Sequence, residues 1–537
     1  MSVKDEPAQS KRDIMSVFRS FGPAGMTSAI LYRNALLAGA GHRCQIVTFN
    51  YAPDGDKHVT TNQQRGRIHP DVQILNLFDW YRALNTVDPV GRREPKTSEL
   101  DEPGLLVQDD EFESHNYARY FSPEGDYVKF KRWTEDRSRV LHVDYFGQNR
   151  ERTYRHEYDV DGRVHREIGY VRGKKNRERY FTVDGFCYLV RSYEPETGAG
   201  MSLFLFTRNS DKVQRFANLW AWRRAWLEEL IAACETKPFV IADGATTPPN
   251  LLKLPRGKAA VAVMIHTHHK TGSGELAEGF SEYFDKLECF DAVITTTEEQ
   301  RDDIRSEYGA PQTVIAIPHA LPSLGVSRQL RATERDQQRV VSVSRLMRGK
   351  RIDEALQVFR LVSAKVPTAT FEIFGAGLAK DQGEVVQELK NLVEELGLSE
   401  KVRFRGHTSQ PLTEMAASGV LLFTSHSEAW GYTVAESLLA GTPVVSYSCE
   451  YGPADLISDG EDGFLIEVGD IKQAAKKLTW LLKNETRALE FGQHGKAKLQ
   501  QKFSDSIILQ SWENVLEKAL SGTGGEQVES LRTDSSD

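Results

Sequence analysis

The stretch Ser-Glu-Ala-Trp-Gly-Tyr-Thr-Val-Ala-Glu at residues 427–436 places two carboxylates, Glu428 and Glu436, eight positions apart. The apolar residues 420–423 before it predict a buried strand, and the apolar pattern at 434–439 predicts a helix. We therefore expect Glu428 in a strand-to-helix loop and Glu436 about one helical turn further on. Such loops lie at the carboxyl ends of parallel strands, where α/β proteins bind their ligands.

Two explanations fit this pair of acids when it is considered alone. Ionised carboxylates only accept hydrogen bonds, so both could hold the hydroxyl groups of one sugar ligand. Alternatively, Glu428 is an ordinary loop residue, and Glu436 is an early helical acid that favours the helix dipole. The flanking sequence decides between them.

Further strand and loop signals surround the pair in a fixed order. Upstream, an apolar strand at 341–344 is followed by Arg345 and, five residues later, by Lys350. Then come Phe-Glu-Ile-Phe-Gly-Ala-Gly at 371–377 and Val-Arg-Phe-Arg-Gly-His at 402–407. With these motifs, the second half of the chain resembles the retaining glycosyltransferases of family 4.

The resemblance implies an α/β fold of the GT-B type, with two Rossmann-like domains and a central cleft. In that family the paired glutamates form the E-x(7)-E signature, and an arginine and a lysine at this spacing bind the donor diphosphate. Arg345 and Lys350 would thus bind phosphate, Glu428 would lie beside the donor sugar, and Glu436 would bind the ribose. The resemblance also implies donor contacts at Gly406, Gly431, Tyr432 and Thr433. A solvated basic stretch is the alternative explanation of Arg345 and Lys350.

Two candidates come from the first half of the chain. A strand at 14–20, a glycine-bearing loop and a helix at 29–40 could bring backbone N–H groups to a phosphate. The G-x-x-G spacing of this loop also fits a plain tight turn, but the resemblance implies that Gly25 faces the donor phosphates. Family members carry a histidine near the reacting sugar, at the strand end that His266 occupies here.

The run His-Thr-His-His at 266–269 also invites a metal interpretation. No C-x-x-C or H-E-x-x-H motif accompanies it, so we expect no metal site. His266 fits the family histidine best, and His269 could reach the same cleft from the following turn.

From about residue 114 to 206 the pattern changes to period two, with turn signals between strand-like runs. This predicts an antiparallel meander inserted into the first Rossmann-like domain. The segment from Lys129 to Arg191 contains sixteen Lys and Arg against ten Asp and Glu, whereas the whole chain carries a net charge of −8. Either one charged face of the sheet is simply solvated, or it is a platform for an anionic acceptor. No nucleic-acid-binding motif is recognisable in it.

An early hairpin-rich domain in a GT-B chain resembles the α-glycosyltransferases of wall teichoic acid, including poly(glycerol-phosphate) α-glucosyltransferases. Related enzymes glycosylate serine-rich adhesins. In both groups this sheet binds acceptor and can mediate oligomerisation. The resemblance therefore implies a polymeric acceptor, peripheral membrane association through that acceptor, and a homo-oligomer formed through the sheet edge.

Composition agrees with an intracellular enzyme. No run of about 18 apolar residues is present, so no membrane-spanning helix is expected. The N-terminus is polar, and the five cysteines are scattered and odd in number, which favours the cytoplasm. We predict a first Rossmann-like domain at 1–110 and 211–322, a sheet insertion at 111–210, a second Rossmann-like domain at 323–505, a crossover helix at 506–520 and a disordered tail at 521–537.

We expect a retaining hexosyltransferase that moves glucose or N-acetylglucosamine from a UDP-sugar to an anionic polymer such as a polyol-phosphate chain. No cofactor, metal or nucleic acid is expected to take part. The alternatives are transfer to a Ser/Thr-rich protein, a GT-B phosphorylase or epimerase, and a non-catalytic GT-B subunit. A phosphorylase would need its pyridoxal-phosphate lysine motif, which we do not find, and epimerases lack this E-x(7)-E context.

Overall fold

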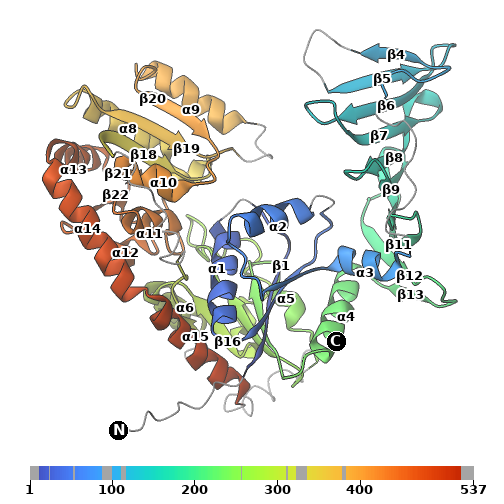
Figure 1. Ribbon diagram of the computed structural model, residues 1–537, viewed down its shortest axis with the longest axis horizontal. Coiled ribbons are helices and arrows are strands. Elements are labelled where there is room, and N and C mark those ends of the chain that lie inside the picture. The colour runs from blue at the N-terminus through green and yellow to red at the C-terminus, as the bar shows by residue number, and fades with distance from the viewer. Residues whose placement is uncertain are drawn as a thin grey trace.

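The computed structural model describes residues 11–22, 25–52, 55–87, 99–109, 116–255, 257–309, 313–321, 335–377 and 383–521. The predicted tail beyond residue 521 and the predicted boundaries near 110 and 322 fall outside these ranges. Within them the chain forms two α/β domains and a separate antiparallel sheet (Figure 1). The predicted fold class is confirmed.

The N-terminal domain is built on a parallel sheet in the order β17-β16-β15-β14-β1-β2-β3. Its strands are β1 (Asp13–Phe18), β2 (Arg43–Thr48), β3 (Gln73–Asn76), β14 (Phe239–Asp243), β15 (Ala260–Met264), β16 (Ala292–Thr295) and β17 (Val314–Ala316). Its helices are α1 (Gly25–Gly39), α2 (Gly55–Gln64), α3 (Leu77–Asn85), α4 (Leu219–Ala232), α5 (Pro248–Leu251) and α6 (Glu298–Tyr308), with a 3₁₀ turn at Phe284–Cys289. Every residue of β1, β14 and β15 is buried, as expected for central strands covered on both faces.

The insertion is a meander in which each strand pairs with the next along the chain, from β4 to β13. Its strands are β4 (Leu106–Asp109), β5 (Tyr117–Phe121), β6 (Tyr127–Trp133), β7 (Val140–Phe146), β8 (Arg152–Tyr158), β9 (Val164–Val171), β10 (Lys174–Phe181), β11 (Cys187–Tyr193), β12 (Gly200–Phe206) and β13 (Val213–Phe216). The period-two pattern predicts that the meander ends near residue 206, but Val213–Phe216 forms one more strand, and α4 begins at Leu219.

One end of the insertion is anchored and the other projects away from both domains (Figure 1). Tyr180, Tyr188 and Leu205 belong to the same buried cluster as Phe78 of α3 and Trp222 of α4. Much of the basic charge is neutralised inside the sheet by cross-strand ion pairs. These pairs join Arg155 to Asp144, Arg166 to Glu157, Arg179 to Glu167 and Arg191 to Glu178.

The C-terminal domain has a second parallel sheet, in the order β20-β19-β18-β21-β22-β23. Its strands are β18 (Asp336–Val343), β19 (Thr370–Phe374), β20 (Val402–Gly406), β21 (Ser418–Phe423), β22 (Val444–Tyr447) and β23 (Gly463–Ile466). Its helices are α8 (Ile352–Ser363), α9 (Glu384–Glu395), α10 (Pro411–Ala416), α11 (Tyr432–Leu439), α12 (Pro453–Leu456), α13 (Ile471–Lys483) and α14 (Glu485–Lys502), with a 3₁₀ turn at Arg348–Lys350.

The last helix, α15 (Asp505–Leu520), leaves the C-terminal domain and packs on the N-terminal one (Figure 1). Trp512 is buried there, and the Arg33 guanidinium lies 5.4 Å from its ring centroid. The side chain of Arg12 donates to the Leu516 carbonyl at 3.2 Å. Among the described residues, no helix combines the length and the apolar character that crossing a bilayer requires.

Helices α11 and α14 approach each other so closely that only glycine fits between them. A Cβ atom on Gly492 would lie 1.9 Å from the carbonyl oxygen of Gly441. We expect Gly492→Ala to lower the free energy of unfolding by about 1–3 kcal/mol, because the backbone of Gly441 must move. Denaturant titration measures the change. Gly39→Ala is the matched control, since Gly39 is also helical and a Cβ there meets nothing within 4 Å.

Candidate active site

Two of the predicted charged residues of the C-terminal domain, Lys350 and Glu428, contact each other directly. The ammonium group of Lys350 donates a hydrogen bond to Oε1 of Glu428, and both side chains are largely buried. Lys350 ends the 3₁₀ turn after β18, whereas Glu428 lies in the loop after β21. Because β18 and β21 are neighbouring parallel strands, both loops leave the same edge of the sheet.

Hydrogen bonds to backbone carbonyls hold these two loops together. The Thr424 hydroxyl donates to the carbonyls of Lys350 at 3.1 Å and of Arg351 at 2.9 Å. The backbone N–H of His426 donates to the Gly349 carbonyl at 3.1 Å. The position of Lys350 is therefore set by the end of β21 as well as by its own turn.

Arg345 lies at the carboxyl end of β18 with an exposed side chain. Its loop packs tightly on the next strand end: a Cβ atom on Gly375 would lie 1.8 Å from the Ser344 oxygen. The backbone N–H of Gly375 in turn donates to the carbonyl of Gly406 at 2.8 Å. The structure thus brings Arg345 and Gly406 to the same edge of the sheet, at the ends of β18 and β20 with β19 between them, and Gly406 is exposed.

The loop between the two glutamates leads into α11. Gly431, with φ +89°, precedes the helix, and the hydroxyl of Thr433 donates to the Val343 carbonyl at 3.2 Å. This bond ties the first turn of α11 to the end of β18, beside Arg345. The first N–H groups of a helix lack partners within it and suit an anion.

Glu436 lies in the second turn of α11 and is partly buried. Burial raises the pKa of Glu436 to about 7, and the charge of Arg67 opposes this only in part. Its neighbour Tyr432 stacks on Tyr32 of α1 at 6.4 Å, so this turn of α11 faces the N-terminal domain. An acid with a pKa near neutrality changes protonation when hydroxyl donors approach it.

His266 lies two residues beyond the end of β15 and belongs to a buried charged network. Its Nε2 lies 2.6 Å from Oδ1 of Asp243, which ends the neighbouring strand β14. Arg33 of α1 donates two hydrogen bonds to the same carboxylate, at 2.9 and 2.6 Å. Burial would raise the pKa of Asp243, but the Arg33 charge and the bond to His266 hold it below its ordinary value. Asp243 therefore stays ionised and fixes the imidazole of His266.

A second histidine links this network to the C-terminal domain. The ring of His319 stacks on His266 at 5.4 Å and lies 5.3 Å from the ring of Tyr432. Burial and the nearby positive charges hold the pKa of His319 well below its ordinary value, so it is neutral. The Tyr432 hydroxyl donates to the Ala320 carbonyl. His266 is thus connected through His319 to Tyr432, which begins the helix that carries Glu436.

His269 lies in a different environment from His266. Its ring is completely buried, 5.6 Å from Phe284 and 6.1 Å from Tyr451. Neither ring nitrogen has a hydrogen-bond partner among the described residues. Burial lowers the pKa of His269 to about 4. It packs as a neutral aromatic group, which gives no support to the expectation that His269 reaches the cleft beside His266 and contacts the donor.

Gly25 begins α1, and a Cβ atom there would meet nothing within 4 Å. Its loop partners at 23 and 24 lie outside the described residues. Met26 approaches Gly244, the residue after Asp243, so the start of α1 lies near the His266 network. Within the described part of the chain, no group of three or more His, Cys, Asp or Glu side chains is arranged to hold a metal ion.

Sequence reasoning missed Arg33, Asp243 and Arg67. Arg33 and Asp243 lie on separate elements 210 positions apart, and neither belongs to a local motif. An acid at the end of an apolar strand, as Asp243 is, was the only available signal. Arg67 lies between α2 and β3 and has no motif at all.

In the protein without ligand, the buried acid Glu436 should lower the free energy of unfolding at neutral pH. Its pKa rises on folding from 4.5 to about 7, so protonation stabilises the fold below pH 4.5 and this contribution is lost as pH rises to 7. We expect the stability advantage of Glu436→Gln over the wild type to grow between pH 5 and pH 8, on the order of 2 kcal/mol. Denaturant titrations at both pH values measure it, and an equal difference at both would contradict the assignment.

Comparisons with known proteins agree with this geometry. Residues 327–498 match the family model of the glycosyl transferases group 1. The chain is 25% identical over 508 residues to the poly(ribitol-phosphate) alpha-N-acetylglucosaminyltransferase of Staphylococcus aureus, covering 91% of this chain and 96% of that protein. It is 23% identical over 513 residues to the poly(glycerol-phosphate) alpha-glucosyltransferase of Bacillus subtilis, covering 92% and 73%.

Among solved structures, a mutant of S. aureus TarM in complex with fondaparinux, alpha-GlcNAc-glycerol and UDP superposes with a TM-score of 0.81. The alignment has 23% identity and covers 94% of this chain and 99% of that one. The chain thus has a GT-B fold, carries a glycosyl transferases group 1 domain at residues 327–498 and is a glycosyltransferase.

Proposed function

We propose that the protein transfers glucose or N-acetylglucosamine from a UDP-sugar to a polyol-phosphate polymer, with retention of the anomeric configuration. The observation that carries the proposal is the contact of Lys350 with Glu428 at strand ends that also present Arg345. The two relatives are both named as transferases of an α-linked sugar to a polyol-phosphate polymer.

The reaction places negative charge on the departing diphosphate, and cations at the strand ends can stabilise it. Arg345 offers a planar fork that fits two phosphate oxygens. The ammonium group of Lys350 carries three N–H donors, of which one is used by Glu428. The two remaining donors can point at phosphate while Glu428 keeps the amine in place. We infer that these cations act without a metal ion.

Glu436 is suited to hold hydroxyl groups of the donor. A carboxyl group whose pKa is about 7 is half protonated at neutral pH. Hydroxyl donors favour the ionised form, so donor binding releases the proton. This makes Glu436 the partner of the ribose hydroxyls in the proposal, whereas Glu428 contacts the sugar.

The acceptor side is assigned to the N-terminal domain and its insertion. His266, fixed by Asp243, lies at the junction where the acceptor hydroxyl must arrive. In the insertion, exposed or half-buried aromatic rings follow one another, including Tyr145 and Tyr154, stacked at 4.4 Å. We propose that this sheet guides the polymer, associates with a second copy of the chain and brings the enzyme to its membrane-bound acceptor. A cytoplasmic location is part of the proposal, and all five cysteines are free thiols.

Removal of either charged group should abolish turnover. We expect Arg345→Ala or Glu428→Ala to lower UDP release in the presence of acceptor by a factor of about 100 or more, because transition-state charge is left unbalanced. Arg348→Ala is the matched control: it removes a cation from the same turn whose side chain contacts Glu388 of α9 at 2.8 Å. Turnover like that of the wild type in either active-site variant would remove the assigned roles.

Donor binding should release a proton near neutral pH. At pH 7 we expect the wild type to release about half a proton per UDP bound and almost none at pH 8.5, because Glu436 is then already ionised. Calorimetry in buffers of different ionisation enthalpy measures the number. Glu436→Gln should release none at either pH. The same release from the variant would place the titrating group elsewhere.

Substrate identity is tested by a screen of donors against acceptors. UDP-, GDP- and ADP-sugars are combined with glycerol-phosphate oligomers, ribitol-phosphate oligomers and a serine-rich peptide, once with EDTA and once with an added divalent cation. We expect turnover with a UDP-sugar and a polyol-phosphate acceptor only. Turnover on the peptide alone would favour the protein-acceptor alternative, and turnover that requires an added divalent cation would refute the metal-free assignment.

A further inference from the structure

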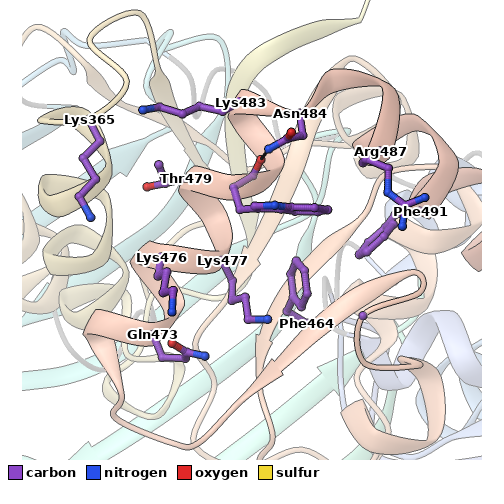
Figure 2. Close-up of a pocket in the computed structure, with 12 residues that line it drawn as sticks. Lys365, Phe464, Gln473, Lys476, Lys477, Thr479, Lys483, Asn484, Arg487 and Phe491 are labelled. Carbon is purple, nitrogen blue, oxygen red and sulfur yellow. Dashed lines mark hydrogen bonds between the residues drawn. The ribbon is translucent and has the colours of Figure 1, made fainter.

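The C-terminal domain carries a cavity of about 540 Å³ that the proposed reaction does not use. It is formed by α13, the start of α14, the start of β23 and Lys365 just beyond α8 (Figure 2). Helices that follow parallel strands run back along them, so the ends of α8 and α13 lie at the edge where the strands begin. Arg345, Lys350 and Glu428 lie at the opposite edge. This cavity is therefore separate from the active site.

The cavity is lined by cations and by no acid. Its charged lining residues are Lys365, Lys476, Lys477, Lys483 and Arg487. Among the described residues, none of the four lysines forms an ion pair, whereas Arg487 contacts Glu490 at 2.5 Å. Helix α13 contains four lysines and no Asp or Glu, in a chain whose net charge is −8. This concentration of unpaired positive charge favours a polyanionic ligand.

Aromatic rings form the apolar part of the same cavity. Phe464 and Phe491 are buried, but 37% of Trp480 is exposed. The Trp480 ring lies 5.7 Å from Phe464 and 5.8 Å from Phe491, so its orientation is held by both. In Figure 2 the amine of Lys477 lies beside Phe464, 4.1 Å from its ring centroid, whereas the amine of Lys483 points away from Phe464 and Phe491. The C–H face of a pyranose ring packs on an exposed aromatic surface of this kind.

We propose that this cavity binds a sugar-substituted segment of a phosphate polymer, as a second site distinct from the one where the sugar is transferred. Trp480 receives the sugar ring, and the lysines that line the cavity receive the phosphates that flank it. The inference rests on the proposed function, because a sugar-bearing phosphate chain is the product of that reaction. A chain held here stays attached to the enzyme while another of its units reaches the junction between the domains.

An anionic membrane would complement the positive charge of the cavity but would not fit its concave shape. Peripheral binding to a bilayer uses an apolar face that protrudes into the lipid. Here Phe464 and Phe491 are buried and Trp480 is partly covered within a concave site. A ligand that enters the cavity with one ring and places its charges at the rim fits this arrangement better.

The first test removes two lysines. Binding of α-glucosyl- and α-N-acetylglucosaminyl-substituted glycerol-phosphate oligomers to the full-length protein is measured without donor. We expect Lys477→Ala/Lys483→Ala to raise the Kd on the order of tenfold, because two charge-assisted contacts are lost. The matched control is Lys390→Ala/Lys472→Ala, which removes two exposed lysines outside the cavity and should bind like the wild type. An unchanged Kd in the cavity variant overturns the proposal.

The second test separates the sugar from the phosphates. Trp480→Ala should weaken binding of the substituted oligomers several-fold and leave binding of unsubstituted glycerol phosphate unchanged, whereas Trp480→Tyr should keep most of the affinity. Thermal unfolding of both variants shows whether the cavity is still folded. Equal losses for substituted and unsubstituted oligomers in a folded Trp480→Ala protein would refute the role of the ring.

Two further measurements distinguish this inference from the alternatives. Turnover on a two-unit acceptor should be the same in the cavity variants and the wild type, while KM for a long polymer rises and kcat stays constant. Absence of turnover in the wild type would refute the proposed function, yet the donor-free binding would still decide the second site. Vesicles containing phosphatidylglycerol are the last probe: if the lysine variant loses vesicle binding but keeps polymer binding, the surface docks on membranes and the proposal fails.

Discussion

The ion pair between Lys350 and Glu428 determines how the active site can be arranged. The two residues are 78 positions apart, yet their loops are joined by the bonds from Thr424 and His426 as well as by the pair itself. The group that would bind phosphate and the group that would bind sugar therefore cannot move independently. A pair of largely buried charges costs desolvation, and its geometry must be good to offset that cost. Such a cost is expected where a site must be preorganised before its ligand arrives.

A small aromatic contact joins the two domains beside the candidate site. His266 is fixed by Asp243, and Asp243 is in turn held by Arg33. Trp512 of the last helix lies over Arg33, so a helix that begins in the C-terminal domain covers the network that positions His266. His319 then carries the connection to Tyr432. A shift of one domain against the other would therefore change the contacts of the His319 ring with His266 and Tyr432.

The sequence could predict the parts of the site that are local in the chain. The spacing of the two glutamates and the strand before Arg345 can be recognised within short segments. In the structure, Arg345, Glu428 and Glu436 follow strands that end at the same edge of the sheet. Asp243 and Arg33 meet only because β14 and α1 lie side by side in the folded domain. His266 and His269 differ by three positions but occupy different environments, because the chain turns between them and only His269 is packed under Phe284 and Tyr451. Periodicity predicted the meander well, but it could not show that β13 extends it past residue 206.

The formal charge of the insertion overstates how strongly it attracts a polyanion, because many of its cations are paired with acids. The segment from Lys129 to Arg191 has sixteen Lys and Arg against ten Asp and Glu, yet Asp144 alone contacts both Arg152 and Arg155, and Glu178 contacts Lys175 and Arg191. Each such pair reduces the field that a distant phosphate experiences. The lysines of α13 number only four, but no acid on the same helix neutralises them. The lysines of α13 beside Trp480 therefore have fewer acidic partners than the cations of the insertion. A polymer acceptor would be attracted there by charge, whereas on the insertion it would rely more on the aromatic rows and on the shape of the sheet.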